Sequence, residues 1–327
     1  MKHCKIVIAG GTGFIGQEMI KHFGKENNII VLTRQLPDAS NNRNRYNSLN
    51  DAALKNVKFI KWDGKEVAEW SNEINGADLI INLAGKSVNC RYTEQNKKEI
   101  LDSRVDAVNA IGKAIEKCST PPTCWINASS ATIYRHAEDR PQDEYTGEFH
   151  SGFSVNVCKA WENAFFNQQT PCTRKVALRM AITLGAGGVL IPYFNLLKLG
   201  LGGKQGSGKQ MYSWIHIKDT CRMIEWINKN ENIEGTYNCS SPNPVSNKEF
   251  MQTLRTATGY KIGLPAFEWM LKIGATVIGT ETELVLKSRW VVPTKISEAG
   301  FQFKYPVLKD ALTDIISEVP RIQYRLF

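Results

Sequence analysis

The stretch Lys5-Ile-Val-Ile-Ala9-Gly-Gly-Thr-Gly-Phe-Ile-Gly16 decides the fold. Its first five residues read as a short apolar strand, and residues 17–23 have the spacing of an amphipathic helix. Glycines between a strand and a helix let the backbone turn sharply and approach a pyrophosphate, to which the helix N-terminus offers free N–H groups. The sequence therefore predicts a dinucleotide site, for which the candidate residues are Gly10, Thr12, Gly13, Phe14, Ile15 and Gly16.

Length and composition predict a soluble, globular protein. The chain has 327 residues, of which 42% are hydrophobic and 22% charged, so it can bury a sizeable core. No apolar run approaches the roughly 20 residues that a membrane helix needs. The first predicted strand begins within a few residues of Met1, which leaves no room for a signal peptide. We therefore expect a cytoplasmic protein without a membrane partner.

Charge and ligand-forming residues exclude two further classes of site. The net charge is +9, but the basic residues are dispersed and no nucleic-acid-binding module is recognisable, so no nucleic-acid partner is expected. The five histidines lack metal-ligand spacing, and the eight cysteines include no Cys-x-x-Cys pair. We expect reduced thiols and no metal, and the basic surface favours an anionic cofactor or substrate.

Strand-like and helix-like segments alternate through the first two thirds of the chain. Such alternation predicts an α/β fold of the Rossmann type, a doubly wound parallel sheet, over residues 1–185. Residues 186–327 are predicted to form a smaller C-terminal α/β lobe over the carboxyl edge of the sheet, with later returns of the chain between the two. Residues 35–56 read as a surface excursion. Further strands are predicted at 29–33, 57–61, 77–83, 124–128 and 174–179, and a long helix at 94–117.

The end of the second strand, Leu32-Thr33-Arg34, indicates which dinucleotide binds. An acidic residue there bonds a ribose 2′-hydroxyl, whereas an arginine pairs with a 2′-phosphate. Because no acid is present, Arg34 favours NADP(H), the alternative being that Arg34 is a solvated surface residue. Asp63, after the third strand, is placed to reach the adenine edge. Leu83, Ala84 and Gly85, after the fourth strand, are predicted to pass close to the cofactor.

With these residues in view, the chain resembles an extended short-chain dehydrogenase/reductase, and more narrowly the atypical "epimerase family protein" branch. Members of that branch are often labelled NDP-sugar epimerases and sometimes cell-division inhibitors. The resemblance covers nearly the whole chain. It rests on Gly10-Gly-Thr-Gly-Phe-Ile-Gly16, Asn82-Leu-Ala-Gly85, Arg91-Tyr-Thr-Glu94, Ala128-Ser-Ser-Ala-Thr-Ile-Tyr134, Cys158-Lys-Ala-Trp-Glu162, Ser213-Trp-Ile-His-Ile-Lys-Asp219 and Glu298-Ala-Gly-Phe-Gln-Phe-Lys-Tyr-Pro306.

The resemblance implies a catalytic serine, tyrosine and lysine, of which this chain keeps two. Ser130 matches the serine and Lys159 the lysine, but the residue four positions before Lys159 is Val155. Valine cannot transfer a proton, whereas Lys159 can still bond the ribose of the nicotinamide nucleoside. Tyr134, Tyr145 or Thr132 could replace the missing acid/base, although a packed aromatic is the better interpretation of Tyr134.

A second departure from the family pattern concerns the substrate. Sugar-nucleotide enzymes of this group usually carry an arginine for the substrate diphosphate at the position of Tyr212, so an NDP-sugar is less expected than the family label suggests. Arg91, Arg104, Tyr134 and Arg179 are the other candidate substrate residues. Arg104 could equally be a surface ion-pair residue. His216 and Asp219 are expected to anchor their loop rather than to carry out chemistry.

Two functions remain open at this point. The first is an oxidoreductase or epimerase that uses NADP(H) on a small carbonyl, alcohol or sugar-like substrate. The second is a regulator that keeps the NADP(H) site without the active-site tyrosine and responds to the state of the cofactor. Relatives in the superfamily often dimerise through two sheet-covering helices, one of which carries the lysine, so a homodimer is also expected.

Overall fold

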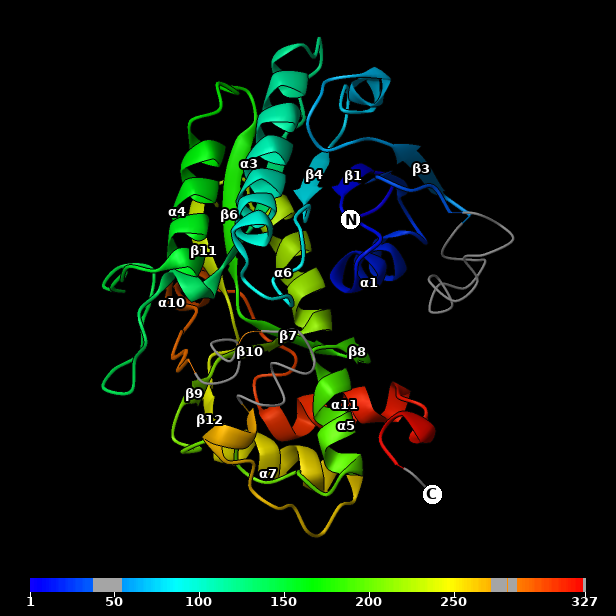
Figure 1. Ribbon diagram of the computed structural model, residues 1–327. Coiled ribbons are helices and arrows are strands. Elements are labelled where there is room, and N and C mark those ends of the chain that lie inside the picture. The colour runs from blue at the N-terminus through cyan, green and yellow to red at the C-terminus, as the bar shows by residue number, and fades with distance from the viewer. Residues whose placement is uncertain (38–54, 272–280, 282–286, 326–327) are drawn as a thin grey trace.

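The computed structural model describes residues 1–37, 55–271, 281 and 287–325. A seven-stranded sheet runs through its centre in the order β11-β6-β5-β4-β1-β2-β3, and all six neighbouring pairs are parallel (Figure 1). The predicted doubly wound parallel sheet is therefore confirmed. The strands are β1 (Lys5–Ala9), β2 (Asn28–Thr33), β3 (Val57–Lys61), β4 (Leu79–Asn82), β5 (Cys124–Ser130), β6 (Arg174–Met180) and β11 (Gly235–Cys239).

Helices cover both faces of this sheet because its strands are apolar on both sides. In β1, Ile6 and Ile8 pack toward α1 (Phe14–Phe23) and α6 (Ile217–Lys229). The alternate residues Val7 and Ala9 pack toward α3 (Glu94–Glu116) and α4 (Phe153–Phe166). The order of strands reverses between β1 and β4, and at such a point the loops diverge and leave a crevice for a ligand.

Most of the remaining elements gather at the end of the sheet where β6 leads into β7 (Figure 1). Their apolar side chains form a third core, to which α5, α7 and α11 contribute. Two small sheets, β10-β7-β8 and β12-β9, connect them. These elements are β7 (Ile182–Gly185), β8 (Gly187–Gly188), α5 (Leu190–Lys198), β9 (Met211–Tyr212), β10 (Trp214–His216), β12 (Val245–Ser246), α7 (Asn247–Thr258) and α11 (Leu308–Glu318), with the 3-10 helix η3 (Arg321–Gln323). The other short helices lie against the central sheet and its helices: α10 (Thr294–Glu298) contacts β11, η1 (Glu69–Glu73) contacts α3, and η2 (Ala131–Ile133) contacts α4.

The chain passes several times between the central sheet with its covering helices and the group of elements that forms the third core. After β10 it returns to the central sheet through α6 and β11, and Ile296 and Phe301 join the same core later. The boundary at residue 185 stays a prediction. The predicted surface excursion at 35–56 lies mostly outside the described residues. In the described part of the chain, no helix combines the length and the apolar character that crossing a bilayer requires.

Candidate functional site

The glycine turn after β1 begins with a residue whose backbone conformation other residues rarely adopt. Gly10 has a φ of +75°, and a Cβ atom at this residue would lie 2.9 Å from the backbone nitrogen of Ala84. A Cβ at Gly16 would lie 2.4 Å from the Cα of Gly11, so the first turn of α1 packs directly on the turn. These contacts bring the turn, α1 and the loop after β4 together at the switch point of the sheet.

The N-terminus of α1 is arranged to receive an anion. Its N-cap residue Gly13 supplies no side-chain hydrogen bond, and the first turn of the helix contains no acidic residue. A Cβ at Gly13 would meet no atom closer than the carbonyl oxygen of Gly10, at 3.7 Å, so this side of the turn is open. The N–H groups of the turn and the positive end of the helix dipole thus fit a pyrophosphate.

The other turn residues hold this arrangement in place. Thr12 accepts a hydrogen bond from the side-chain amide of Gln17, at 2.9 Å, through its carbonyl oxygen. The Phe14 ring lies so close to the loop after β7 that a Cβ at Gly185 or Gly188 would approach it to 2.7 or 2.8 Å. The half-buried Ile15 packs on the core between the sheet and α1. Of the predicted turn residues, Phe14 and Ile15 thus brace the turn.

The loop after β4 is shaped by buried amides. Asn82 accepts a hydrogen bond from the backbone N–H of Ala84 (3.0 Å) and donates one to Asn127 of β5 (2.7 Å). Arg104 lies against Gly85: a Cβ atom on Gly85 would be 3.1 Å from the guanidinium carbon of Arg104. Leu83 and Ala84 pass directly beside Gly10, as a close approach to a cofactor requires, and Gly85 lies against Arg104.

Arg104 braces this loop from α3. Its Nη1 donates to the carbonyl oxygens of Lys86 (3.1 Å) and Ile100 (2.8 Å), and its guanidinium lies 5.1 Å from the centre of the Trp161 ring. Burial lowers the pKa of Arg104 from its usual value. The surface ion pair considered for this residue is not present among the described residues.

A pocket of about 370 Å³ lies where β2 and β3 end. It brings together Arg34 and Asp63, the two residues predicted to contact the adenosine end of the cofactor. The Oδ1 atom of Asp63 accepts hydrogen bonds from the backbone N–H groups of Lys65 (2.8 Å) and Glu66 (3.0 Å), and these bonds hold the pKa of the carboxyl below its usual value. Lys61, Trp62, Ala68 and Trp70 complete the lining.

Ser130 and Lys159 belong to elements that pack on each other. Ser130 ends β5, and its Oγ accepts a hydrogen bond from the backbone N–H of Thr132 (3.2 Å). Lys159 lies on α4 with an exposed side chain whose Nζ is 5.8 Å from the centre of the Phe149 ring. α4 packs against η2, so the two candidate catalytic side chains come from adjoining segments.

Val155, which stands where the family has tyrosine, is part of an apolar floor. Its side chain is only 3% exposed and packs in a cluster with Ala131, Ile133 and Cys158. Val291, from the C-terminal part of the chain, closes the same cluster. The tyrosine position is therefore filled by a packed aliphatic side chain, and no proton donor stands there.

Tyr134 and Arg179 belong to a buried polar network. Arg179 forms a bidentate pair with Glu162 of α4, with both N–O distances at 2.8 Å, and donates to the Tyr134 hydroxyl (2.8 Å). Tyr134 in turn donates to Asn238 (3.0 Å), and Ser129 donates to Glu162 (2.6 Å). Burial raises the pKa of Tyr134. These contacts place both candidates in the framework beneath the site, and their contact with a substrate stays a prediction.

Two residues near the end of the chain reach the candidate site and were missed by sequence reasoning. Lys287 donates to the carbonyl oxygen of Thr132 (3.0 Å), and the Nε of Arg289 donates to the Thr132 hydroxyl (3.3 Å). Nothing in the sequence spacing indicates that residues 287–289 lie beside residue 132.

Tyr145, the other candidate acid, is exposed and donates to Glu298 (2.8 Å).

The remaining predicted substrate residues lie in different surroundings. Arg91 is exposed and its Nη1 is 3.6 Å from a carboxylate oxygen of Glu281. Tyr212 is buried in the third core, where its ring stacks on Phe250 with the centres 4.3 Å apart. The predicted contact of Tyr212 with a substrate stays a prediction, and the burial of its ring disfavours it.

His216 and Asp219 anchor the C-terminal segment. The Nδ1 of His216 accepts from the backbone N–H of Lys218 (3.0 Å), so in the neutral ring the proton is on Nε2, 3.1 Å from an Asp314 carboxylate oxygen. Burial lowers the pKa of His216 to about 4. Asp219 accepts from the backbone N–H groups of Lys304 (2.9 Å) and Tyr305 (2.8 Å). Both side chains make the structural contacts expected for an anchored loop.

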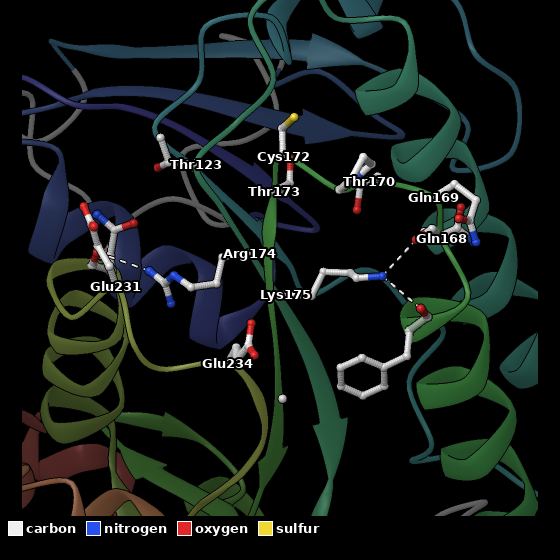
Figure 2. A pocket seen from close by; sticks show the side chains of 14 residues that line it. Thr123, Gln168, Gln169, Thr170, Cys172, Thr173, Arg174, Lys175, Glu231 and Glu234 are labelled. Atoms are coloured by element: carbon white, nitrogen blue, oxygen red, sulfur yellow. Dashed lines mark hydrogen bonds between the residues drawn. The ribbon is translucent and has the colours of Figure 1, made fainter.

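A larger pocket, of about 950 Å³, lies at the opposite edge of the sheet, where β5, β6 and β11 begin (Figure 2). Its two cationic side chains donate hydrogen bonds to backbone carbonyl oxygens at the ends of α6 and α4. Arg174 donates to the carbonyl oxygens of Ile227, in the last turn of α6, and of Ile233, which follows this helix. Lys175 donates to those of Phe166, the last residue of α4, and of Gln168. The pocket is thus a polar surface groove remote from the glycine turn. Among the described residues, no three His, Cys, Asp or Glu side chains are grouped as metal ligands.

Comparisons with known proteins agree with this geometry. Residues 6–240 match the model of the NAD dependent epimerase/dehydratase family, and residues 266–315 match a domain of unknown function, DUF1731. The epimerase family protein YfhF of Bacillus subtilis is 30% identical over 314 residues, which are 96% of this chain and 98% of the relative. The mouse epimerase family protein SDR39U1 is 29% identical over 96% of this chain and 100% of the relative.

Solved structures extend the likeness to three dimensions. A crystal structure of human SDR39U1 (isoform 2) with NADPH has a TM-score of 0.81 at 26% identity, over 96% of this chain and 99% of the human one. A UDP-N-acetylglucosamine 4-epimerase from Methanobrevibacter ruminantium shares the fold, with a TM-score of 0.74 at 16% identity over 97% and 98% of the two chains. The fold is thus one that binds a nicotinamide dinucleotide, and the chain belongs to the NAD dependent epimerase/dehydratase family within the extended short-chain dehydrogenases/reductases.

Proposed function

We propose that this protein binds NADP(H) and acts as an oxidoreductase on a small carbonyl or alcohol substrate. The observation that carries the choice of cofactor is the pocket at the ends of β2 and β3, where Arg34 stands at the position that selects the 2′ substituent. A guanidinium pairs well with a phosphate, and β2 is followed by Arg34 and not by a carboxylate. The human relative that was solved with NADPH supports the same choice.

Each part of the site has a role in this proposal. The glycine turn and the N-terminus of α1 hold the pyrophosphate, and Asp63 faces the adenosine end. Lys159, with its exposed ammonium group, orients the ribose hydroxyls of the nicotinamide nucleoside. Ser130 donates a hydrogen bond to the substrate oxygen. When bound, the cofactor would supply a hydride to a carbonyl carbon or accept one from an alcohol carbon. Because Val155 provides no proton donor, the proton that the substrate oxygen gains or loses would be exchanged with solvent.

A second candidate function is a cofactor-binding regulator. The packed side chain of Val155 favours it, because the site lacks the usual proton donor while the binding residues are kept. Both functions require NADP(H) binding, and only the enzyme requires Ser130. The absence of a cation at Tyr212, which is buried among aromatic rings, disfavours a sugar-nucleotide substrate for either function.

Calorimetric titration of cofactor-stripped protein with NADPH, NADP, NADH and NAD tests the proposal. We expect tighter binding of the two phosphorylated forms. Arg34→Ala should weaken NADPH binding by about 1.5–3 kcal/mol, the range for a charged hydrogen bond, and leave NADH binding nearly unchanged. Absence of binding by all four, or an unchanged NADPH-to-NADH ratio in Arg34→Ala, would contradict the proposed function.

A screen of carbonyl substrates by NADPH absorbance then separates the enzyme from the regulator. If turnover is found, Ser130→Ala should lower it and keep the affinity for NADPH. Equal turnover in Ser130→Ala would remove Ser130 from the mechanism. NADPH binding without turnover of any substrate class would favour the regulator.

A further inference from the structure

The ends of β2 and β3 place a second cation beside Arg34. Thr33 and Lys61 are opposite each other in the register of the two strands, and the backbone N–H of Trp62 donates to the carbonyl oxygen of Thr33 at 3.0 Å. Arg34 directly follows Thr33, so the side chains of Arg34 and Lys61 leave neighbouring strand ends. Both line the same pocket of about 370 Å³.

Among the residues that the structure describes, no ion pair balances the two cations of this pocket. Neither Arg34 nor Lys61 forms a hydrogen bond or ion pair with the residues that the structure describes, and both side chains are exposed. Asp63 is the acidic residue of the lining, and its Oδ1 accepts the backbone N–H groups of Lys65 and Glu66. The lining therefore presents two cations and one carboxylate that is turned toward its own loop.

A comparison along β3 shows that this lack of a partner is specific to Lys61. Lys58, three residues earlier on the same strand, donates to a carboxylate oxygen of Glu73 at 2.6 Å. Exposed lysines on an edge strand such as β3 also discourage pairing with other chains, and Lys58 fulfils that role as well as Lys61 does. Discouraging strand pairing therefore does not explain why Lys61 lines the pocket.

From this geometry we infer that Lys61 is a second specificity residue for the cofactor and forms, together with Arg34, a clamp for a phosphate monoester on the ribose. A phosphate monoester carries about −1.5 to −2 charges near neutral pH, so one cation does not neutralise it. The planar guanidinium of Arg34 and the compact ammonium of Lys61 would bind different oxygens of the group. This inference rests on the proposed binding of NADP(H). It assigns the second cation to the end of β3, whereas the sequence rule for cofactor choice considers only the end of β2.

Titration of the full-length chain with NADPH, NADH and adenosine 2′,5′-bisphosphate tests the clamp. Lys61→Ala should weaken NADPH and the bisphosphate about tenfold each and leave NADH unchanged, because only the first two carry the 2′-phosphate. Lys61→Arg should retain most of the preference. Lys58→Ala, the matched control on the same strand, should behave like the unaltered protein with all three ligands.

The outcomes separate this inference from the proposed function. If the unaltered protein prefers NADPH and Lys61→Ala keeps the full preference, the clamp is wrong and NADP(H) binding stands. If the unaltered protein binds NADH as tightly as NADPH, both fall. An equal loss of NADH and NADPH in Lys61→Ala would also overturn the clamp, and urea denaturation of that variant would identify unfolding as the cause of such a loss.

Discussion

The glycine turn and the floor beneath Ser130 lie at the same edge of one sheet, yet they are built in opposite ways. The turn at residues 10–16 is made of backbone groups and ends at an uncapped helix N-terminus. The floor is made of packed side chains, in which Val155 is 3% exposed and Tyr134 is 2% exposed. One region leaves its polar groups available, and the other packs apolar side chains around a tyrosine whose hydroxyl is hydrogen-bonded to Arg179 and Asn238.

The difference indicates that binding and proton transfer are separable in this fold. Holding a dinucleotide depends on backbone conformation, which several glycines determine together. In the family pattern, proton transfer depends on one tyrosine side chain, and here Val155 of α4 stands at that position. Val155 can therefore fill the tyrosine position without disturbing the turn, which is more than 100 residues away in the chain.

The largest effect should follow from breaking the buried pair beneath the floor. Glu162→Met leaves the Arg179 guanidinium without its carboxylate partner in a buried position. Removing one member of a buried ion pair typically costs about 3–5 kcal/mol, and we expect that loss in the free energy of unfolding measured with urea. Since the turn is independent of this pair, the NADPH affinity of the folded variant should be nearly unchanged.

The control is the double variant Glu162→Met with Arg179→Met. It removes both charges, so it should recover much of the lost stability. A single variant as stable as the unaltered protein would show that the pair does not hold the floor. A large loss of NADPH affinity in the folded single variant would contradict the separation of the two regions.

Acidification should weaken the anchor of the C-terminal segment before it affects the turn. Burial lowers the pKa of His216 to about 4 in the folded state, against an ordinary value of 6.5, and outweighs the attraction of the Asp314 carboxylate. Between these values the unfolded chain binds a proton that the folded chain does not. His216 should therefore reduce the stability progressively as the pH falls from about 6.5 to about 4, by about 3 kcal/mol in total.

Urea denaturation at several pH values measures this slope. His216→Asn keeps a side chain that can cap α6 but cannot titrate, so its stability should fall less steeply over the same range. Parallel pH profiles for the two proteins would show that His216 is not the titrating group. Residues 10–16 contain no ionisable side chain, so the turn itself adds no pH dependence.

The elements that sequence patterns predicted well are those whose cause is local. The strands at 5–9 and 57–61 were predicted with the bounds that the structure has, because apolar runs next to turn residues define them. The need for glycine at residue 10 follows from the strand–turn–helix pattern, and its positive φ bears this out. Arg34 and Asp63 were placed at one end of the cofactor by their strand positions, and one pocket holds both.

The contacts that sequence patterns did not predict join distant parts of the chain. Glu162 and Arg179 pair across a helix and a strand, and nothing in the spacing of two charged residues indicates that they face each other. Lys287 and Arg289 reach Thr132 from more than 150 residues away. The replacement of tyrosine by Val155 was visible in the sequence. The residues that close the space around it, including Val291, depend on tertiary packing.

The smallest effect should come from restoring the family residue. Val155→Tyr inserts a large ring into a cluster that Ala131, Ala181 and Val291 already fill. Overpacking of this kind usually costs about 1–3 kcal/mol, so we expect a lower urea midpoint and no gain of NADPH oxidation with carbonyl substrates. Val155→Ile, a smaller enlargement, should be closer to the unaltered protein. A Val155→Tyr variant with full stability and higher reductase activity than the unaltered protein would contradict this expectation. It would show that residue 155 can reach the substrate and that the identity of this one residue accounts for the difference between the two regions.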